Sequence, residues 1–341
     1  MIVADDAALL EAQGVAGALV GGPVELCRLQ AGGRNSRIYR VRSGGRLLAL
    51  KQYPSRQDDP RDRLSTEVGA LRLMERCGVA SVPRVVGADR QRGYALLTWI
   101  DGSAVGNVTD SDIDAAVAFL GAIRDMRREP DAVQQPMAAE ACLSGVEIER
   151  QLHARLALLR ALRHERELVD FIDGSLTPEL ARRKADARDA AAAAGLDFAA
   201  DLPQEWRTLV PADFGFHNSL RRSDGSLAFV DFEYFGWDDP VKLTADILLH
   251  PGWPLPPSQR RRFRAAAMRL YGEDPLFGLR LEAYLPLFAL RWALILLNEF
   301  VPERWQRRVL AGETASWDEA KARQLARARA FLAALPHTVE A

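Results

Sequence analysis

The chain has 341 residues, and its 45 basic and 46 acidic side chains leave a formal net charge of −1 at pH 7. Because nucleic-acid binders depend on excess positive charge, this balance argues against a general nucleic-acid-binding protein. Hydrophobic residues make up 48% of the chain and charged residues 27%, a composition typical of a soluble globular protein with one large domain or two lobes.

The first hundred residues show mostly the alternating pattern of β-strands. Strands are predicted at residues 26–29, 38–41, 47–53, 82–86 and 94–99. A single helix is predicted between them, at residues 60–77. This part of the chain therefore predicts a small β-rich lobe that ends near residue 100.

The remainder of the chain is mostly helical. It is alanine-rich and helical to about residue 200, returns to β structure at residues 209–235, and continues as helices from about residue 246 to residue 335. The pattern predicts an α+β fold with a smaller lobe, residues 1–100, and a larger helical lobe, residues 101–341. A cleft between two such lobes is a natural ligand site.

One apolar stretch and the first residues bear on localisation. Residues 284–297 are few for a membrane span and include Pro286 and Arg291, so they predict a buried core helix. Asp5 and Asp6 lie where an export signal needs positive charge. We therefore expect no membrane partner and no export signal.

The cysteines form no metal-binding or disulfide pattern. Three are scattered along the chain, at Cys27, Cys77 and Cys142. Such a sparse, odd set is typical of free thiols in a reducing compartment. The sequence thus favours a cytoplasmic protein and leaves its oligomeric state open.

Lysine is rare in this chain, which makes one position informative. Only four of the 45 basic residues are lysine, and Lys51 ends an apolar strand. The choice of lysine there indicates that a compact point charge is needed. In the next helix, Glu67 lies within the apolar stripe that includes Leu64 and Leu71. We predict that Glu67 pairs with Lys51; the alternative is that both side chains extend into solvent.

A glycine-containing turn precedes that strand. Residues 31–36 read Ala-Gly-Gly-Arg-Asn-Ser. Backbone amides in such a turn can bind phosphate, although most Gly-Gly pairs are plain hairpin turns. Both interpretations stay open from the residues alone.

Residues 218–231 predict a β-hairpin that could hold a metal ion. Asp224-Gly225 lies between apolar runs and indicates a two-residue type I′ turn. With that turn, Asn218 directly faces Asp231, and opposed side chains have Cβ atoms about 4.5–5.5 Å apart. An amide oxygen and a carboxylate would then converge as hard ligands for Mg²⁺. The alternative for Asp231 is a turn or capping role.

Asp213 lies five residues before Asn218. A carboxylate just ahead of the metal pair could accept a proton from a substrate hydroxyl, or it could be a turn or capping residue. We interpret His217 as a residue that orients or packs rather than as a catalytic group.

In chain order these features resemble the aminoglycoside phosphotransferase and choline kinase-like family, which has the protein-kinase fold. The resemblance covers residues 26–246 in motif order and most of the chain in lobe organisation. It implies a nucleotide-binding β-rich lobe at residues 1–100. It also implies a mostly helical lobe at residues 101–341 that contains the catalytic loop, the metal-binding hairpin and the acceptor pocket.

The resemblance implies ATP, or another nucleoside triphosphate, and Mg²⁺ as cofactors. Asp213 matches the catalytic aspartate, and Asn218 and Asp231 match the metal ligands. The implied nucleotide-binding residues are Gly32, Gly33, Asn35 and Ser36 in the loop over the phosphates, the pair Lys51 and Glu67, and Thr98 and Ile100 in the hinge at residues 97–100.

The catalytic loop departs from the family pattern. The usual His-Gly-Asp reads Pro211-Ala212-Asp213, so the histidine that orients the loop is missing, and a position that is often histidine is Gly215. Asp239-Pro240 resembles the family's Asp-Pro pair. The aspartate expected four residues after Asp239 is Leu243, which Asp246 could replace. No phosphate-binding, metal-binding or proton-accepting group is lost, so an active enzyme is expected.

The acceptor pocket is the least determined part of the site. Glu233, Arg291 and Glu299 are candidate substrate contacts. Arg291 either pairs with a buried acid or binds an anionic or sugar group. Acidic residues near Asp112 either attract a cationic amine or cap a helix. Trp253 and Trp292 either stack on a sugar ring or pack in the core.

We therefore predict a small-molecule kinase that moves the γ-phosphate of ATP to a hydroxyl of a sugar, amino sugar, aminoglycoside or amino alcohol. One alternative is a catalytically weak nucleotide-binding regulatory module, suggested by the missing loop histidine. The other is a protein kinase, which is less favoured because no Ala-Pro-Glu-type segment follows Asp231.

Overall fold

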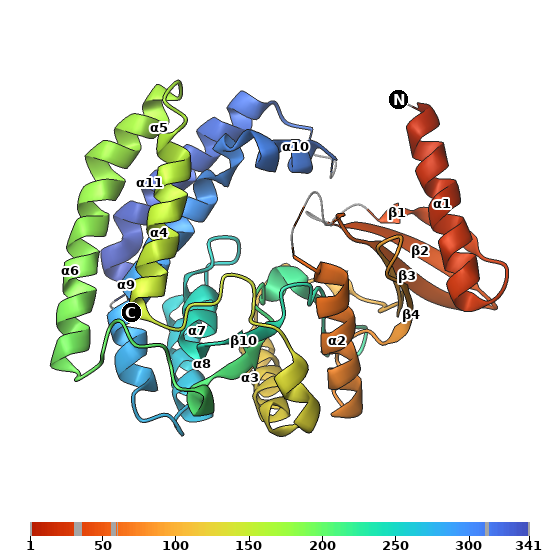
Figure 1. Ribbon diagram of the computed structural model, residues 1–341, viewed down its shortest axis with the longest axis horizontal. Helices are drawn as coiled ribbons and strands as arrows, with labels where there is room; N and C mark the ends of the chain where they lie inside the picture. Colours follow the sequence, from red (N-terminus) through yellow and green to blue (C-terminus); the bar gives the residue numbers. More distant parts are fainter. Residues whose placement is uncertain (1, 31–35, 56–58, 60, 311–313, 340–341) are drawn as a thin grey trace.

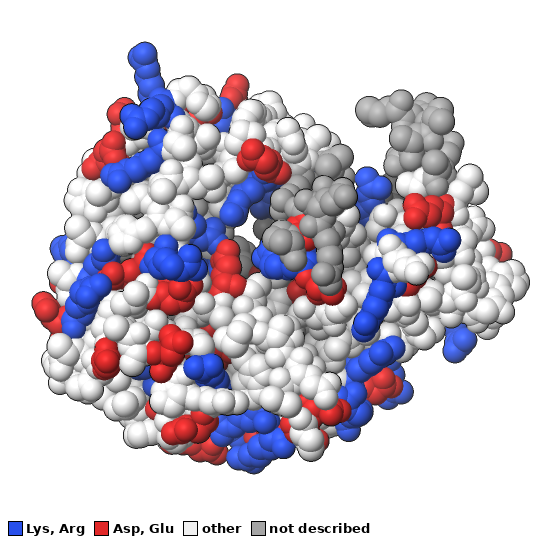
Figure 2. All heavy atoms as spheres, in the orientation of Figure 1, with Lys and Arg blue, Asp and Glu red and all other residues white. Residues whose placement is uncertain are grey.

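The structure is a computed structural model, and it describes residues 2–30, 36–55, 59, 61–310 and 314–339. It confirms the predicted two-lobed, protein-kinase-like α+β fold. A small sheet with two helices forms the N-terminal lobe, and a larger mostly helical lobe follows (Figure 1). Basic and acidic side chains are interspersed over the face drawn in Figure 2, as the near-zero net charge leads one to expect.

The N-terminal lobe is built on a five-stranded antiparallel sheet with the strand order β1-β2-β3-β5-β4. Its strands are β1 (Glu25–Gln30), β2 (Arg37–Ser43), β3 (Arg46–Gln52), β4 (Val85–Asp89) and β5 (Tyr94–Thr98). All five were predicted, but β4 begins three residues later than expected. Pro83 lies in the predicted segment, and proline has no N–H to donate to a strand ladder.

Two helices cover opposite faces of this sheet. They are α1 (Ile2–Val20), which was not predicted, and α2 (Arg63–Arg76), which lies within the predicted helix. Because successive residues of a strand point to opposite faces, Leu50 of β3 packs in the cluster with α1. The next residue, Lys51, pairs across the sheet with Ala95, which packs in the cluster with α2. Strand alternation therefore directs Lys51 toward α2.

Helix α1 was missed because its sequence carries little amphipathic signal. Alanine, glycine and leucine occur around the whole helix, so no single stripe stands out. Ala12, Val15 and Ala16 are nevertheless fully buried against the sheet. Only the sheet, which accepts small side chains closely, defines which face of α1 is the inner one.

The C-terminal lobe is a helical body with two small sheets. Its α-helices are α3 (Asp110–Asp125), α4 (Gly145–Arg160), α5 (Arg166–Phe171), α6 (Thr177–Ala193), α7 (Pro240–Leu249), α8 (Pro257–Leu270), α9 (Phe277–Leu296), α10 (Pro302–Leu310) and α11 (Trp317–Val339). The short strands are β6 (Ser103–Ala104), β7 (Thr208–Val210), β8 (Ser219–Arg221), β9 (Leu227–Phe229) and β10 (Gly236–Asp238). They pair as β6-β8-β9 and β10-β7, all antiparallel.

Helix α9 lies at the centre of this body and includes all but the last residue of the core helix predicted at residues 284–297. Residues 277–300 are long and apolar enough to cross a membrane by composition, but 72% of the most apolar window is buried inside the protein. Its neighbours are α4, α6, α7 and α11. The prediction of a buried core helix is therefore confirmed.

The acidic start of α3 is structural. Thr109 caps the helix, and Asp112 completes a capping box with it. The Asp112 carboxylate also accepts hydrogen bonds from Arg221 of β8 at 2.7 and 2.8 Å. Asp114 pairs with Arg262 of α8. The capping alternative is thus confirmed for this segment.

Candidate active site

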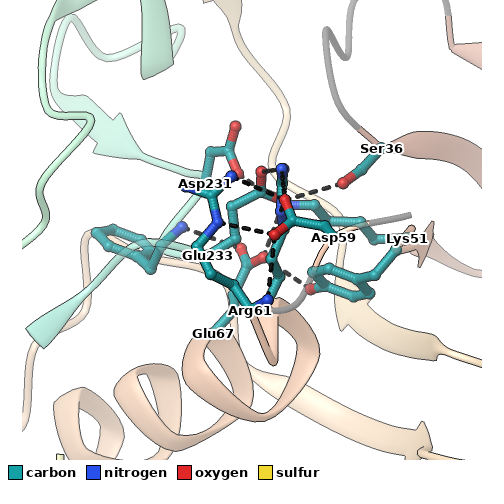
Figure 3. Close-up of polar contacts among 10 residues, drawn as sticks. Ser36, Lys51, Asp59, Arg61, Glu67, Asp231 and Glu233 are labelled. Carbon is teal, nitrogen blue, oxygen red and sulfur yellow. Dashed lines mark hydrogen bonds and ion pairs between the residues drawn. The ribbon is translucent and has the colours of Figure 1, made fainter. Parts of the chain in front are cut away.

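Lys51 is the hub of a buried ion cluster between the lobes (Figure 3). Its Nζ lies 2.6 Å from Glu67 Oε2, 2.6 Å from Asp231 Oδ1 and 3.2 Å from Glu233 Oε2. The predicted pairing of Lys51 with Glu67 is confirmed. The side chain of Glu67 is further fixed, because Tyr53 Oη and the Phe232 backbone N–H donate to its two oxygens.

A second cation completes the cluster from the start of α2. Arg63 Nη1 lies 2.5 Å from Glu233 Oε1, and the same guanidinium pairs with Asp59. Ser36 Oγ donates to Glu233 Oε2 at 2.9 Å. Glu233 thus connects Ser36, α2 and the segment after Asp231. Sequence reasoning missed Arg63 and Asp59, whose spacing of four residues in an arginine-rich chain carries no distinctive signal.

The cluster has more negative than positive charge. Glu67, Asp231 and Glu233 each offer an oxygen within 4.8 Å of the others, against the two cations Lys51 and Arg63 among the described residues. Removal from water raises the pKa of Asp231 above its ordinary value; Lys51 opposes this rise, and the other two carboxylates add to it. Hard carboxylate oxygens with an unbalanced charge suit a divalent cation such as Mg²⁺. The residues therefore fit the metal that the sequence predicts.

Asp231 occupies a strained backbone position at the edge of the cluster. Its φ is +72°, a left-handed conformation that non-glycine residues adopt at a cost of about 1–3 kcal/mol. Its side chain is 34% exposed, whereas those of Glu67 and Glu233 are 1% exposed. Of the three carboxylates, Asp231 is the one that a ligand from solvent can reach.

The loop that contains Asp213, the predicted catalytic residue, follows β7. The Asn218 side-chain amide donates to the backbone oxygen of Asp213 at 2.9 Å, and Val230 N–H donates to the backbone oxygen of Asn218 at 3.0 Å. These two bonds connect the Asp213 loop with the strand that leads into Asp231. The Asp213 side chain is 44% exposed, and His217 Nε2 lies 3.3 Å from its Oδ1.

The predicted register of the metal hairpin is wrong by one residue. Ser219 faces Phe229 and Leu220 faces Ala228, so Asn218 lies opposite Val230 and not opposite Asp231. Of the two turn residues, only Gly225 has a positive φ, +84°. A type I′ turn needs positive φ at both positions, so the hairpin instead closes through a three-residue loop.

A family model matches most of this chain. The model of the phosphotransferase enzyme family matches residues 26–281, which is most of the chain. The chain belongs to this phosphotransferase family. No curated protein matches the sequence.

Several solved structures share the fold of this family member. An aminoglycoside phosphotransferase from Alicyclobacillus acidocaldarius is 15% identical, with 92% of this chain and 93% of that chain covered at a TM-score of 0.53. The choline kinase of Streptococcus pneumoniae is 15% identical, with 94% and 97% covered at a TM-score of 0.55. A thermostable mutant aminoglycoside phosphotransferase in ternary complex with AMP-PNP and hygromycin B is 17% identical, with 92% and 95% covered at a TM-score of 0.51.

The structure describes only some of the other residues that the sequence predicts to bind nucleotide. Gly32, Gly33 and Asn35 lie outside the described residues. Thr98 ends β5, where its backbone N–H and hydroxyl oxygen both bond the backbone of Arg84 in the neighbouring segment. Ile100 follows and, with Thr98, lines a cavity of about 500 Å³. That cavity is bounded by Arg84 and the hairpin turn near Asp224 rather than by the Lys51 cluster, so we do not assign it to the nucleotide phosphates.

Asp239-Pro240, which resembles the family's Asp-Pro pair, forms the start of helix α7. Asp239 caps α7 by accepting from Val241 N–H, and its carboxylate pairs with Arg280 of α9. Lys242, for which the sequence indicated no role, is buried between Asp238 and Asp246 at 3.3 and 3.6 Å.

Two of the three candidate substrate contacts bind other protein groups in the C-terminal lobe. Arg291 Nη2 lies 2.6 Å from Glu140 Oε2, and its Nη1 lies 3.3 Å from Asp246 Oδ1. Of the two alternatives for Arg291, the structure shows the pairing with acids. Glu299 is buried, with its Oε1 2.9 Å from Arg308 Nη2, and its role as an acceptor contact stays a prediction. The third, Glu233, lies in the ion cluster described above.

The Glu140 pair predicts a pH-dependent stability. Burial alone would raise its pKa, but Arg291 and Arg155 lower the pKa of Glu140 to about 2. The resulting stabilisation is complete well above the ordinary glutamate pKa and is lost as the pH falls from about 4.5 toward about 2. Because the side chain is 39% exposed, we expect Glu140→Gln to lower the free energy of unfolding by only about 1–2 kcal/mol at pH 7.

Urea unfolding measures this effect. The difference between wild type and Glu140→Gln should be smaller at pH 4 than at pH 7. Glu282→Gln is the matched control, because Glu282 is 64% exposed beside Arg264 and should change stability little. A difference that is constant between the two pH values would contradict the assignment.

The backbone conformation of Ala212 suggests a stabilising substitution at this position. It stands where the family has glycine, and its φ is +64°. Glycine adopts this conformation without a Cβ penalty, although it also raises the entropy of the unfolded chain. We expect Ala212→Gly to raise the free energy of unfolding by about 0.5–1 kcal/mol, measured by urea unfolding. Ala228→Gly, in β9 with ordinary φ, is the control and should be destabilising.

Proposed function

We propose that this family member transfers the γ-phosphoryl group of ATP, or of another nucleoside triphosphate, to a hydroxyl of a small molecule. The observation that carries the proposal is the cluster of Lys51 with Glu67 and Asp231, linked through Asn218 to the Asp213 loop. A placed lysine, a metal-binding carboxylate and an accessible carboxylate base are the parts that phosphoryl transfer uses. The relative that binds AMP-PNP supports a nucleotide as the donor.

In this mechanism Lys51 binds the phosphate chain. It is held by Glu67 and Glu233, so the ammonium group is already in place when nucleotide arrives. Its pKa is raised well above the ordinary lysine value: burial opposes ionisation, but Asp231 and Glu67 more than offset that effect. Lys51 therefore stays charged throughout the neutral pH range.

Asp231 and Asn218 would hold Mg²⁺. When bound, this ion supplies positive charge that offsets the negative charge developing on the transferred phosphoryl group. Glu233 is the third carboxylate of the cluster. Burial would raise its pKa, but Lys51 and Arg63 lower the pKa of Glu233, so it remains an anion and stabilises both cations.

Asp213 is the proposed base. It would orient the acceptor hydroxyl and take its proton as the hydroxyl oxygen bonds to the γ-phosphorus and the bond from that phosphorus to the β–γ bridging oxygen breaks. The side chain is partly exposed, so an acceptor can approach it from solvent. The nucleoside diphosphate then leaves with the bridging oxygen.

For the acceptor, we propose a sugar, amino sugar, aminoglycoside or amino alcohol. One structural relative is an aminoglycoside phosphotransferase in complex with hygromycin B, and another is a choline kinase. The names of these two proteins thus point to an aminoglycoside and an amino alcohol as their acceptors. A protein acceptor is disfavoured, because residues 232–239 between Asp231 and α7 are short and mostly buried. Such a segment leaves no long loop to bind a peptide.

A catalytically weak nucleotide-binding module is the second candidate. It is motivated by Pro211 in place of the family's loop histidine. The two functions are separated by measuring ADP release with ATP and Mg²⁺ against sugars, amino sugars, aminoglycosides, choline and homoserine, with Asp213→Asn as the control. Acceptor-dependent ADP release that the control lacks supports the kinase. Nucleotide binding without any turnover over the panel supports the module, and phosphate found only on protein would favour a protein kinase.

A further inference from the structure

A histidine that follows the proposed base in the sequence contacts it, whereas the family's histidine precedes the base. The family's histidine precedes the aspartate, where this chain has Pro211. Here His217, four residues after Asp213, places its Nε2 3.3 Å from Asp213 Oδ1. His217 lies in the short turn Phe216–Asn218, next to the proposed metal ligand Asn218. Whether His217 donates or accepts in this contact depends on its tautomer.

Trp253 decides the direction. Its indole Nε1 lies 3.2 Å from His217 Nδ1, and an indole N–H can only donate a hydrogen bond. His217 Nδ1 must therefore be the unprotonated nitrogen of a neutral imidazole. The proton is then on Nε2, which becomes a donor toward the Asp213 carboxylate.

The stacking of the aromatic rings is consistent with these two hydrogen bonds. His250 stacks on His217 with centroids 4.9 Å apart at 15°, and on Trp253 with centroids 4.7 Å apart at 13°. His217 and Trp253 are thus each nearly parallel to His250, so their two ring planes are also close to parallel. An indole N–H and an imidazole lone pair each point in the plane of their ring, so parallel rings with Nε1 and Nδ1 3.2 Å apart suit a hydrogen bond between them.

Gly215 makes room for the pair. A Cβ at this position would lie 2.5 Å from the Trp253 ring and 2.9 Å from His217 Nδ1, which no side chain tolerates. The φ of Gly215 is 168°, an extended conformation open to any residue, so space and not backbone strain requires the glycine. Gly215, one of the departures from the family pattern, therefore accompanies the His217–Trp253 pair.

We propose that His217 is a positioning residue that donates its Nε2–H to Asp213 and that Trp253 fixes the tautomer this requires. The inference rests on the proposed role of Asp213 as the base. By bonding Oδ1, His217 restricts rotation of the carboxylate and directs it toward the acceptor hydroxyl. Misplacement of a reacting group by about 1 Å can cost about 10²-fold in rate, so the positioning has a measurable effect.

Two substitutions separate the two bonds. Glutamine at position 217 carries an amide nitrogen near the place of Nε2, so His217→Gln keeps a donor to Asp213 and loses the acceptor for Trp253. Asparagine carries its amide near the place of Nδ1, so His217→Asn keeps a partner for Trp253 and loses the donor. If His217 only filled space, the two substitutions would not affect the Asp213 and Trp253 hydrogen bonds differently.

The kinetic arm measures kcat and KM with ATP, Mg²⁺ and the acceptor found by the ADP-release panel, or with water as the acceptor. We expect His217→Asn to lower kcat about tenfold with the KM for ATP unchanged, since the Lys51 cluster is intact. His217→Gln should stay within about threefold of wild type, and Trp253→Phe should lie between the two. His153→Asn, on the exposed surface of α4, is the control.

The spectroscopic arm needs no acceptor. In protein with ¹⁵N-labelled histidine and tryptophan at about pH 8.5, well above the ordinary histidine pKa, His217 should show an unprotonated Nδ1 and a protonated Nε2. The Trp253 indole N–H, assigned by its loss in Trp253→Phe, should shift upfield and exchange faster in His217→Gln than in His217→Asn. A proton on Nδ1 of His217 in the wild-type protein overturns the proposal.

The outcomes also separate this inference from the proposed function. Normal turnover by Asp213→Asn contradicts the role of Asp213, and the positioning role fails with it. An inactive Asp213→Asn together with full kcat in His217→Asn contradicts the positioning role alone. Equal losses in His217→Asn and His217→Gln show that His217 acts only by packing.

Discussion

Asp213→Asn is expected to lower kcat for phosphoryl transfer by about 10²–10⁴-fold, the usual contribution of a positioned general base. Asparagine has the shape of aspartate and can still accept a hydrogen bond from His217, so the loop should keep its conformation. What is lost is the negative charge that takes the proton of the acceptor hydroxyl. Nucleotide affinity should change little, because Asp213 contributes no contact to Lys51 among those described.

The measurement is steady-state ADP release, with nucleotide binding followed by calorimetry. Asp224→Asn is the matched control, since Asp224 lies in the nearby hairpin turn and bonds only to Ser226 among the described side chains. It should keep wild-type kcat. Turnover of Asp213→Asn within a few-fold of wild type would falsify the proposed mechanism.

Asp231→Asn is expected to lower transfer by about 10³-fold or more, since a lost metal ligand removes several kcal/mol of transition-state stabilisation. Asp231→Ala should have an equal or larger effect. Stability should not fall in the same way. The raised pKa of Asp231 means that ionising this carboxylate is less favourable in the folded, metal-free protein than in the unfolded chain. The ionised carboxylate therefore lowers the free energy of unfolding at neutral pH, and this loss is relieved as the pH falls.

The Asn variant removes this destabilising negative charge and keeps a residue type that tolerates a positive φ. Urea unfolding without metal should therefore give a free energy of unfolding at pH 8 equal to or above that of wild type. Mg²⁺ with nucleotide should raise the Tm of wild type and not that of the variant. An Asn variant that loses more than about 2 kcal/mol, or that keeps its Mg²⁺ response, would show that Asp231 is a structural anion and not a ligand.

The sequence predicted the parts of the site that depend on local periodicity. Lys51 faces α2 because strands alternate, and Glu67 faces inward because it lies in an apolar helical stripe. Both patterns extend over only a few residues, so they are readable without the fold. The departures at Pro211 and Gly215 were visible too, but their consequence was not.

The hairpin shows where local reading fails. Asp224-Gly225 indicated the turn correctly, yet the loop has three residues, because Gly225 alone takes a positive φ. A one-residue difference in loop length shifts every pair in the hairpin. Asn218 and Asp231 are therefore linked through the backbone at Val230 rather than directly opposed.

By itself, then, the sequence determined the two-lobed fold, the Lys51–Glu67 pair and the order of the candidate catalytic and metal-binding residues. The tertiary structure alone decided three sets of contacts: Arg63 with Glu233, Arg291 with Glu140, and Trp253 with His217. The physical reason is that periodicity states which side of its own element a residue occupies. Which side chain it meets there depends on how distant segments dock, and a pair separated by 36 to 170 residues leaves no local pattern to read.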